Sequence, residues 1–172
     1  MKIAITATHR VGKTSLAESL VEILPEYQIQ PEPYYQLEES GILFSESPTI
    51  TDFLLQLDYA IEQCHTDNQN IIFDRCPLDL LAYIHALDKT KNIQFLYNQV
   101  ENALKQIEFL IFIPIESPDL IGCPASAYPI LRKQVNDILE EWICDFDIEF
   151  IQVNGTIKNR IDQVLKRIKK VV

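Results

Sequence analysis

The chain has 172 residues, 47% of them hydrophobic, which is enough to bury the core of a folded domain and excludes a disordered chain. Its net charge of −10 argues against a nucleic-acid partner, because phosphate backbones attract surplus Lys and Arg. No apolar run approaches the roughly 20 residues of a membrane span. The first strand is predicted directly after Met1, which leaves no room for a signal peptide, so we expect a cytoplasmic protein without a membrane partner.

The chain opens with an apolar stretch, residues 2–7, that predicts a buried strand. A loop ending in Gly12, Lys13 and Thr14 follows, and then an amphipathic helix over 13–24. This order is the pattern of a Walker A phosphate-binding loop (P-loop). Gly12 allows close approach to an anion, Lys13 adds a charge for the β- and γ-phosphates, and the Thr14 hydroxyl can hold Mg²⁺. The residues expected to bind the nucleotide are Thr8, His9, Arg10, Val11, Gly12, Lys13, Thr14, Ser15 and, near the last predicted turn, Gly155.

One position departs from the motif. Ala7 stands where the pattern G-x-x-x-x-G-K-[ST] has its first glycine. If the loop needs a positive φ there, alanine costs about 1 kcal/mol. We interpret the stretch as a P-loop because both the strand before it and the helix after it are present. The alternative is a chance Gly-Lys-Thr after an apolar strand.

Beyond the first helix, apolar runs alternate with helical periodicities. Prolines mark several boundaries: they end the first helix and stand where later helices are expected to begin. The remaining strands are predicted over residues 27–30, 70–74, 109–113 and 148–153. Helices are predicted over 48–64, 77–87, 93–107, 129–142 and 157–168, with a short helix or irregular flap over 34–44 and an irregular segment over 114–128. Strands in continuous apolar runs with helical crossovers predict an α/β fold, a parallel sheet covered by helices on both faces.

The strand over residues 70–74 ends in Asp74, and Arg75 follows. A carboxylate beside a P-loop can orient Mg²⁺, so Thr14 and Asp74 are the predicted metal residues. Arg75 is expected to point toward the transferred phosphoryl group, where developing charge needs a cation. The alternative is a strand-end aspartate that caps the helix beginning at Pro77.

Glu32 follows the second strand and lies between Pro31 and Pro33. Because prolines stiffen the local backbone, this carboxylate is suited to accurate placement. It could accept a proton from an attacking hydroxyl group. The alternative is an ordinary exposed glutamate in a loop.

Together, the loop over residues 7–15, Pro31-Glu32-Pro33 and the run Asp74-Arg75-Cys76-Pro77-Leu78-Asp79 resemble the P-loop kinases of nucleosides and nucleotides. The likeness is greatest to the small AAA-type ATPases with a ribosylnicotinamide-kinase-like domain, and the Glu-Pro and Asp-Arg elements are also similar to those of deoxynucleoside kinases. The resemblance implies a three-layer P-loop NTPase fold with a five-stranded parallel sheet in the order 2-3-1-4-5. It implies phosphoryl transfer from ATP with Mg²⁺ to a small acceptor, with Glu32 as the base and with Asp74 and Arg75 touching metal and phosphates.

We expect one domain over residues 1–172, with an acceptor-side region over 32–68 and a lid over 114–132. Kinases of this type offer lid arginines to the transferring phosphate, yet residues 115–131 contain no Arg or Lys. Arg132 and Lys133 on the following helix are the nearest cations, and Arg10 could substitute in part. The predicted catalytic residues are Lys13, Glu32, Asp74, Arg75 and Arg132.

The predicted acceptor side is acidic, with twelve carboxylates and no Lys or Arg between Lys13 and Arg75. A nucleoside monophosphate would need arginines there, so we expect a neutral or cationic acceptor such as a nucleoside or a ribosylated base. The alternative function is an ATPase, switch or accessory module that binds or hydrolyses ATP without a small acceptor. The aromatic residues that could stack on a base, or alternatively belong to the core, are Tyr34, Tyr35, Phe44, Phe53 and Tyr59.

Overall fold

The computed structural model describes residues 1–119 and 121–171 and has an α/β fold. Five parallel strands form one sheet within this part of the chain, in the order β2-β3-β1-β4-β5. The strands are β1 (Lys2–Thr6), β2 (Gln28–Gln30), β3 (Ile71–Phe73), β4 (Phe109–Phe112) and β5 (Phe150–Gln152). The order is the 2-3-1-4-5 order that the resemblance implied, so the predicted fold is confirmed.

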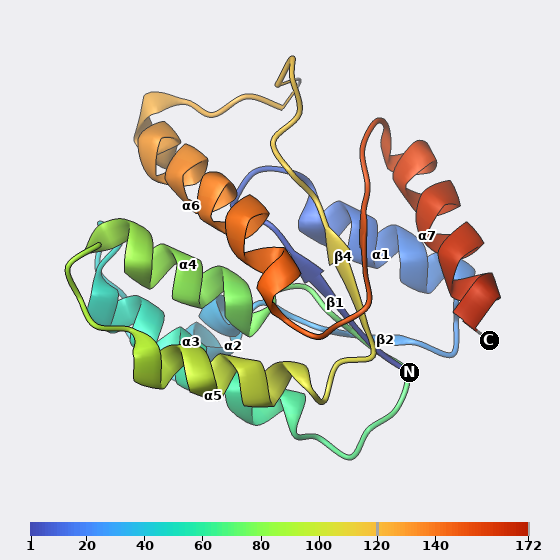
Figure 1. Ribbon diagram of the computed structural model, residues 1–172, viewed down its shortest axis with the longest axis horizontal. Coiled ribbons are helices and arrows are strands. Elements are labelled where there is room, and N and C mark those ends of the chain that lie inside the picture. Colours follow the sequence, from blue (N-terminus) through green and yellow to red (C-terminus); the bar gives the residue numbers. More distant parts are fainter. Residues whose placement is uncertain (120, 172) are drawn as a thin grey trace.

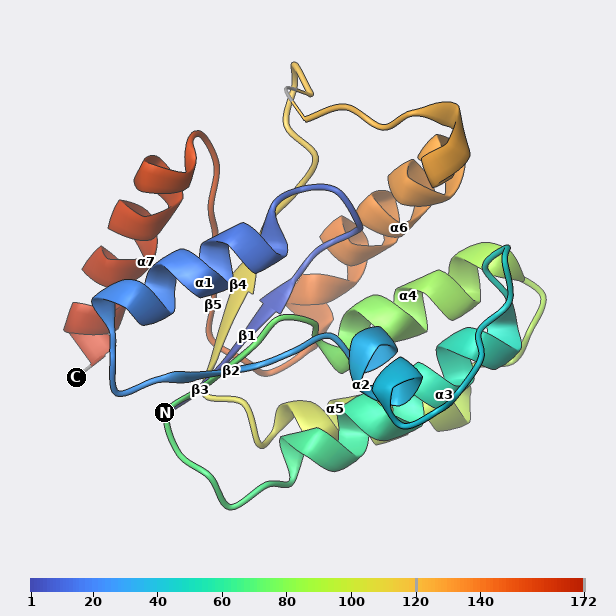
Figure 2. The same ribbon diagram turned by 180° about the vertical axis from the view of Figure 1, so that it is seen from behind.

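Helices cover both faces of the sheet (Figures 1 and 2). One face carries α1 (Lys13–Ile23) and α7 (Ile157–Val171), which lie side by side. The other face carries α3 (Ile50–Cys64), α4 (Pro77–Leu87), α5 (Gln94–Leu104) and α6 (Pro129–Trp142). The short helix α2 (Pro33–Glu39) packs against α3. Figure 1 places the loop after β1 and the segment after β4 at the same edge of the sheet, where ligands bind in such folds.

Most element boundaries lie within two residues of the prediction, and the differences have local causes. The helix predicted from residue 48 begins at Ile50, because Thr49 is extended and its hydroxyl accepts the Asp52 backbone N–H at 3.2 Å. The stretch over 34–44, which the sequence left open between a helix and a flap, forms most of α2 and then an irregular segment.

The sheet separates two hydrophobic clusters, and β1 contributes to both. Ile3 and Ile5 pack with Leu16 of α1 in one cluster, whereas Ala4 belongs to the other. This division follows from the alternation of side chains along a strand. Helix α4 is nearly enclosed, because α3, α5 and α6 all contact it. The first residues of α4, which follow β3, are therefore buried among other elements at the carboxyl-end edge of the sheet.

Two further features of the described residues bear on the sequence expectations. None of their helices is both long and apolar enough to cross a membrane. The four cysteines are free thiols; Cys64 and Cys76 are buried, Cys123 is half-buried and Cys144 is exposed. Burial raises the pKa of the Cys64 thiol to about 12, so this thiol is inert at neutral pH.

The enclosure of α4 predicts a large effect of truncating Leu81, whose side chain is fully buried. Leu81→Ala is expected to lower the free energy of unfolding by about 2–5 kcal/mol, because it removes buried methyl groups and leaves a cavity. The matched control is Leu43→Ala, since Leu43 is 95% exposed; it should change stability by less than about 0.5 kcal/mol. Denaturant unfolding measures both. A loss below about 1 kcal/mol for Leu81→Ala would contradict the packing around α4.

Candidate active site

The loop between β1 and α1 is shaped to surround an anion. Arg10 and Gly12 both have left-handed backbone conformations, with φ of 56° and 89°, and such turns direct successive N–H groups into a concavity. Thr14 and Ser15 are exposed in the first turn of α1, whose N-terminus favours negative charge. Ala7 does not have a positive φ. The conditional strain considered for alanine at this position therefore does not arise, and the unusual conformation lies at Arg10 instead.

Lys13 reaches from α1 to both the P-loop backbone and Glu32. Its side chain is buried; the Nζ donates to the Thr8 carbonyl at 3.1 Å and lies 3.8 Å from Glu32 Oε1. Burial is the largest cause of a lowered Lys13 pKa, the neighbouring charge of Arg75 adds to it, and Glu32 opposes both. A partly desolvated ammonium group beside the loop gains from the approach of an anion.

Glu32 and Arg75 form an ion pair at the carboxyl ends of β2 and β3. The two strands pair in register, Gln30 beside Phe73, so the residues that follow them meet. Arg75 Nε and Nη2 donate to Glu32 Oε2 at 3.0 and 2.8 Å. Burial alone would raise the Glu32 pKa, but the charges of Arg75 and Lys13 outweigh burial and lower it. Glu32 is therefore ionised at neutral pH and able to accept a proton.

Asp74 ends β3 in a buried position with an unmatched oxygen. Its Oδ1 has no hydrogen-bond partner among the described residues. Burial raises the Asp74 pKa to about 6, and the Thr14 side chain opposes this shift. An unpaired buried carboxylate oxygen beside a hydroxyl group fits a cation site, because leaving such a charge unpaired is costly. Thr14 and Asp74, the two predicted metal residues, therefore fit Mg²⁺.

Helix α4 contributes a carboxylate to the site, at a position the sequence analysis did not assign. Asp79 is fully buried and accepts hydrogen bonds from the Thr6 hydroxyl and from the Ala7 backbone N–H, the latter at 3.1 Å. Burial raises the Asp79 pKa to about 6. Asp79 stands in the run that carried the resemblance, but only the packing of α4 against the end of β1 brings it to Ala7.

The second residue that α4 contributes, Tyr83, binds His9 of the P-loop. The Tyr83 hydroxyl accepts the His9 backbone N–H at 2.8 Å and lies 2.6 Å from His9 Nδ1. His9 Nε2 lies 2.6 Å from the carbonyl of Ala127, which can only accept, so Nε2 carries the proton and Nδ1 accepts from Tyr83. Burial is the main cause that lowers the His9 pKa to about 4, so the ring is neutral.

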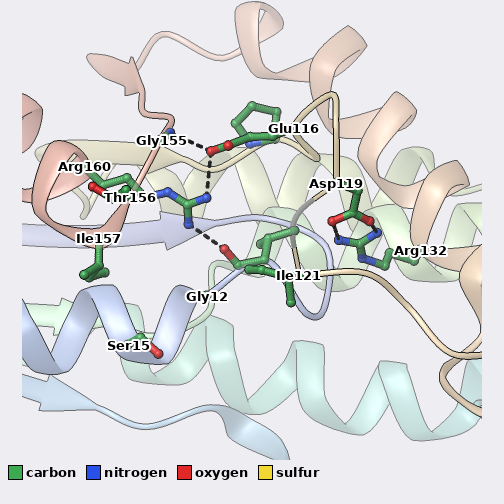
Figure 3. A pocket seen from close by; sticks show the side chains of 12 residues that line it. Gly12, Ser15, Glu116, Asp119, Ile121, Arg132, Gly155, Thr156, Ile157 and Arg160 are labelled. Atoms are coloured by element: carbon green, nitrogen blue, oxygen red, sulfur yellow. Dashed lines mark hydrogen bonds and ion pairs between the residues drawn. The ribbon is translucent and has the colours of Figure 1, made fainter.

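A cavity of about 300 Å³ opens on one side of the P-loop (Figure 3). Gly155, which was expected to bind the nucleotide, lines this cavity, but its N–H is already bound to Glu116 Oε1 at 2.7 Å. The predicted residues Val11, Gly12 and Ser15 also line this cavity. Its other lining residues come from the segment after β4, from α6, and from α7 and the turn before it, and include Glu116, Asp119, Ile121, Arg132, Thr156, Ile157 and Arg160.

Arg132 is tied to the P-loop backbone. It is buried, and its Nε and Nη2 donate to the carbonyls of His9 and Arg10 at 2.9 and 3.0 Å. Its Nη1 donates to Asp119 Oδ2 at 2.5 Å, and Figure 3 shows the two side chains facing each other. Lys133, the other candidate cation, is exposed and pairs with Asp137. The structure thus places Arg132 beside the loop but directs its donors to protein oxygens.

A second cavity, of about 350 Å³, lies on the other side of the P-loop and has aromatic and acidic walls. Tyr34 stacks on Phe44, and Phe53 stacks on Tyr83, each pair with ring centroids 4.7 Å apart. Four of the five predicted aromatics line the cavity, and Tyr59 does not. Phe53 also packs against the core, as the alternative interpretation expected. The polar lining residues that bear on chemistry are His9, Glu32, Glu46, Asp52, Gln56 and Arg75.

The P-loop therefore separates two cavities that differ in character. Val11 and Gly12 face the first cavity, and His9 faces the second. Glu32 lines the second cavity and lies beside Lys13. Glu32 and Lys13 therefore lie where the P-loop meets the second cavity.

Comparisons with known proteins agree with this geometry. A family model described as an AAA domain matches residues 2–160. No curated protein matches the chain. Among solved structures, deoxyadenosine kinase from M. mycoides with bound dATP superposes with a TM-score of 0.66 at 18% identity, over 98% of this chain and 100% of that chain.

Two further solved structures share the fold. Thymidylate kinase from Candida albicans has a TM-score of 0.64 at 20% identity, over 98% of this chain and 91% of that chain. The NadR protein in complex with NR has a TM-score of 0.63 at 14% identity, over 96% of this chain and 51% of that chain. These likenesses extend over nearly the whole of this chain and show a P-loop kinase fold.

The neutral His9 predicts a pH dependence of stability. Its pKa is lowered from 6.5 to about 4 in the folded chain, so the unfolded chain binds a proton first and the folded state loses stability as pH falls from about 6.5 toward 4. We expect the unfolding free energy to drop more between about pH 7 and pH 4.5 for the wild type than for His9→Gln. Urea unfolding at the two pH values measures the difference, and equal drops would contradict the neutral ring.

Proposed function

This chain belongs to the AAA domain family, and on that premise we propose that it is a kinase that transfers the γ-phosphoryl group of Mg·ATP to a hydroxyl group of a small, nucleoside-like acceptor. One observation carries the proposal: the P-loop lies between two cavities, and the acceptor-side cavity contains an ionised carboxylate, Glu32, next to Lys13. An ATPase needs only the first cavity. A second cavity with aromatic walls beside the P-loop favours a second substrate.

On the donor side, the P-loop N–H groups, Lys13 and the first turn of α1 would hold the phosphates. Mg²⁺ would be held by Thr14 and Asp74, and when bound it would supply positive charge to the transferring phosphoryl group. The unpaired Oδ1 of buried Asp74 supports this assignment. The region over 114–132 would form the outer wall of the donor cavity and act as the lid.

On the acceptor side, Glu32 would take the proton of the attacking hydroxyl group. Arg75 orients this carboxylate through two hydrogen bonds to one oxygen, Oε2, which leaves Oε1 to face the substrate and Lys13. The Lys13 charge helps to lower the Glu32 pKa. Engagement of Lys13 by phosphate would lessen this effect and make Glu32 a stronger base in the loaded site.

The charges of the acceptor cavity support a neutral or cationic acceptor. Of its lining residues only Arg75 is an Arg or Lys, and Arg75 is already paired with Glu32. His9 is neutral, while Glu46 and Asp52 add negative charge to the wall. A second phosphate group would thus meet carboxylates and no free cation. The region over 32–68 supplies most of this wall, and Tyr34, Phe44 and Phe53 would contact a base.

One observation favours a second candidate, an ATPase or switch module. Arg132 is bound by Asp119 and by two P-loop carbonyls, so it offers the transferring phosphate little free donor capacity. Slow, acceptor-independent hydrolysis that a protein partner stimulates would fit such a site. The second cavity remains unexplained by this candidate.

The kinase proposal predicts acceptor-dependent release of ADP from Mg·ATP. Neutral nucleosides and ribosylated bases, including ribosylnicotinamide, should raise the rate at least tenfold over ATP alone, whereas their monophosphates should not, because the acceptor cavity repels phosphate. A coupled assay of ADP with each acceptor in turn measures this. Lys13→Ala is the negative control, since it removes the charge for the phosphates. Turnover of monophosphates alone would refute the acceptor class, and acceptor-independent release would favour the ATPase.

The role of Glu32 predicts a separation of transfer from ATP binding. Glu32→Gln should reduce kcat roughly 10²–10⁴-fold, because the amide cannot accept the proton, while the Kd for Mg·ATP changes little. The control is Glu39→Gln, which removes the same charge from an exposed glutamate in α2. Steady-state kinetics and nucleotide titration measure both quantities. A Glu32→Gln enzyme with full activity would remove Glu32 from the role of base.

A further inference from the structure

The carbonyl groups of the P-loop are bound, one after another, by cationic side chains. Lys13 Nζ binds the Thr8 carbonyl at 3.1 Å, and Arg132 binds the next two carbonyls at 2.9 and 3.0 Å. The fourth, that of Val11, accepts a hydrogen bond from Arg160 Nη1 at 2.6 Å. The run ends at Gly12, whose carbonyl accepts an N–H in the first turn of α1. Charged donors thus replace the backbone partners that these carbonyls would have in a helix or sheet.

This arrangement sets the direction of the N–H groups. A trans peptide is planar, with its carbonyl oxygen and its N–H on opposite sides. When Arg160 holds the Val11 carbonyl, the N–H of Gly12 must point away from Arg160. The carbonyls bound by Arg132 direct the N–H groups of Arg10 and Val11 in the same manner. The cations outside the loop therefore turn its N–H groups toward the anion-binding side.

Arg160 is built into this position. It lies in α7, 149 residues from Val11 in sequence, and its side chain is 8% exposed. Its Nη2 donates to Glu116 Oε1 at 2.8 Å, and the same oxygen accepts the Gly155 N–H at 2.7 Å. Figure 3 shows the Arg160 guanidinium between Glu116 and the P-loop. A Cβ at Gly12 would lie 3.3 Å from Arg160 Nη1, so the absence of a side chain at Gly12 leaves room for the arginine.

We infer that Arg160 is a positioning residue of the donor site, which holds the P-loop in its phosphate-binding conformation and is itself held by Glu116. The inference rests on the proposed binding of ATP at the P-loop, but not on transfer to an acceptor. Through Arg160, the direction of the Val11–Gly12 peptide group depends on α7, on the segment after β4 and on the turn at Gly155. Arg160 acts through Val11 rather than by touching the transferred phosphoryl group.

Removal of Arg160 should weaken the binding of a ligand more strongly, the more phosphate groups that ligand places in the loop. For Arg160→Gln we expect the Kd of Mg·ATP and of inorganic tripolyphosphate to rise about 10- to 100-fold, as for the loss of a charge-assisted hydrogen bond. The Kd of AMP should change less, because AMP fills less of the loop. Arg160→Lys retains one cationic donor and should recover part of the affinity. Isothermal titration measures these constants, and circular dichroism with thermal unfolding checks the fold.

Arg167→Gln is the matched control. Arg167 lies on the same helix, is 43% exposed and pairs with Glu149, so the variant changes the net charge equally without reaching the P-loop. It should bind ATP as the wild type does. Glu116→Gln should weaken the binding of tripolyphosphate by a few-fold. In the Arg160→Gln background it should cause little further loss of affinity, because Glu116 acts through Arg160.

Three results would overturn the inference: wild-type tripolyphosphate affinity in folded Arg160→Gln, an equal loss in Arg167→Gln, or a loss for ATP without one for tripolyphosphate. If Arg160→Gln fails to fold, Arg160→Lys decides, and wild-type affinity in that variant counts against the role of the planar guanidinium. A wild-type chain that binds Mg·ATP but transfers nothing overturns the kinase proposal and leaves this inference standing. A chain that does not bind Mg·ATP overturns both.

Discussion

The carbonyl groups of the P-loop have to be satisfied without the partners of a helix or a sheet, and much of this structure serves that constraint, while Asp79 and Tyr83 bind the N–H groups of Ala7 and His9. Lys13, Arg132 and Arg160 bind four successive carbonyls of the P-loop. These donors come from α1, α6 and α7, which lie on both faces of the sheet. The loop conformation therefore depends on the whole fold, and the left-handed backbone of Arg10, which costs about 1 kcal/mol or more, is held by its neighbours.

Each cation that reaches the loop is balanced by a carboxylate. Glu32 lies beside Lys13, Asp119 pairs with Arg132, and Glu116 pairs with Arg160. Buried charges without partners would be too costly to keep. Asp119 and Glu116 come from the segment after β4, so this segment takes part in the electrostatics of the site although residues 115–131 contain no Arg or Lys. Its contribution is to hold arginines of other elements in place.

The second cavity is organised differently, by α4. Asp79 fixes the start of the loop at Ala7, and Tyr83 holds His9 and carries Arg75 over its ring at 5.6 Å from the centroid. Arg75 in turn directs Glu32. One enclosed helix thus connects the P-loop, Glu32 and the aromatic wall of the second cavity. Helix α4 is in turn contacted by α3, α5 and α6.

The sequence by itself determined the fold class and the P-loop, because apolar strands are separated by one or two helices throughout and the residues of the motif act together within one short stretch. It also determined that Glu32, Asp74 and Arg75 lie at strand ends, which a parallel sheet brings to one edge. Only the tertiary structure decided the roles of Asp79, Tyr83, Glu116 and Arg160, and the binding of Arg132 to the loop. These contacts join residues far apart in sequence. Their partners are mostly backbone groups, which every residue has, so the residue types do not reveal them.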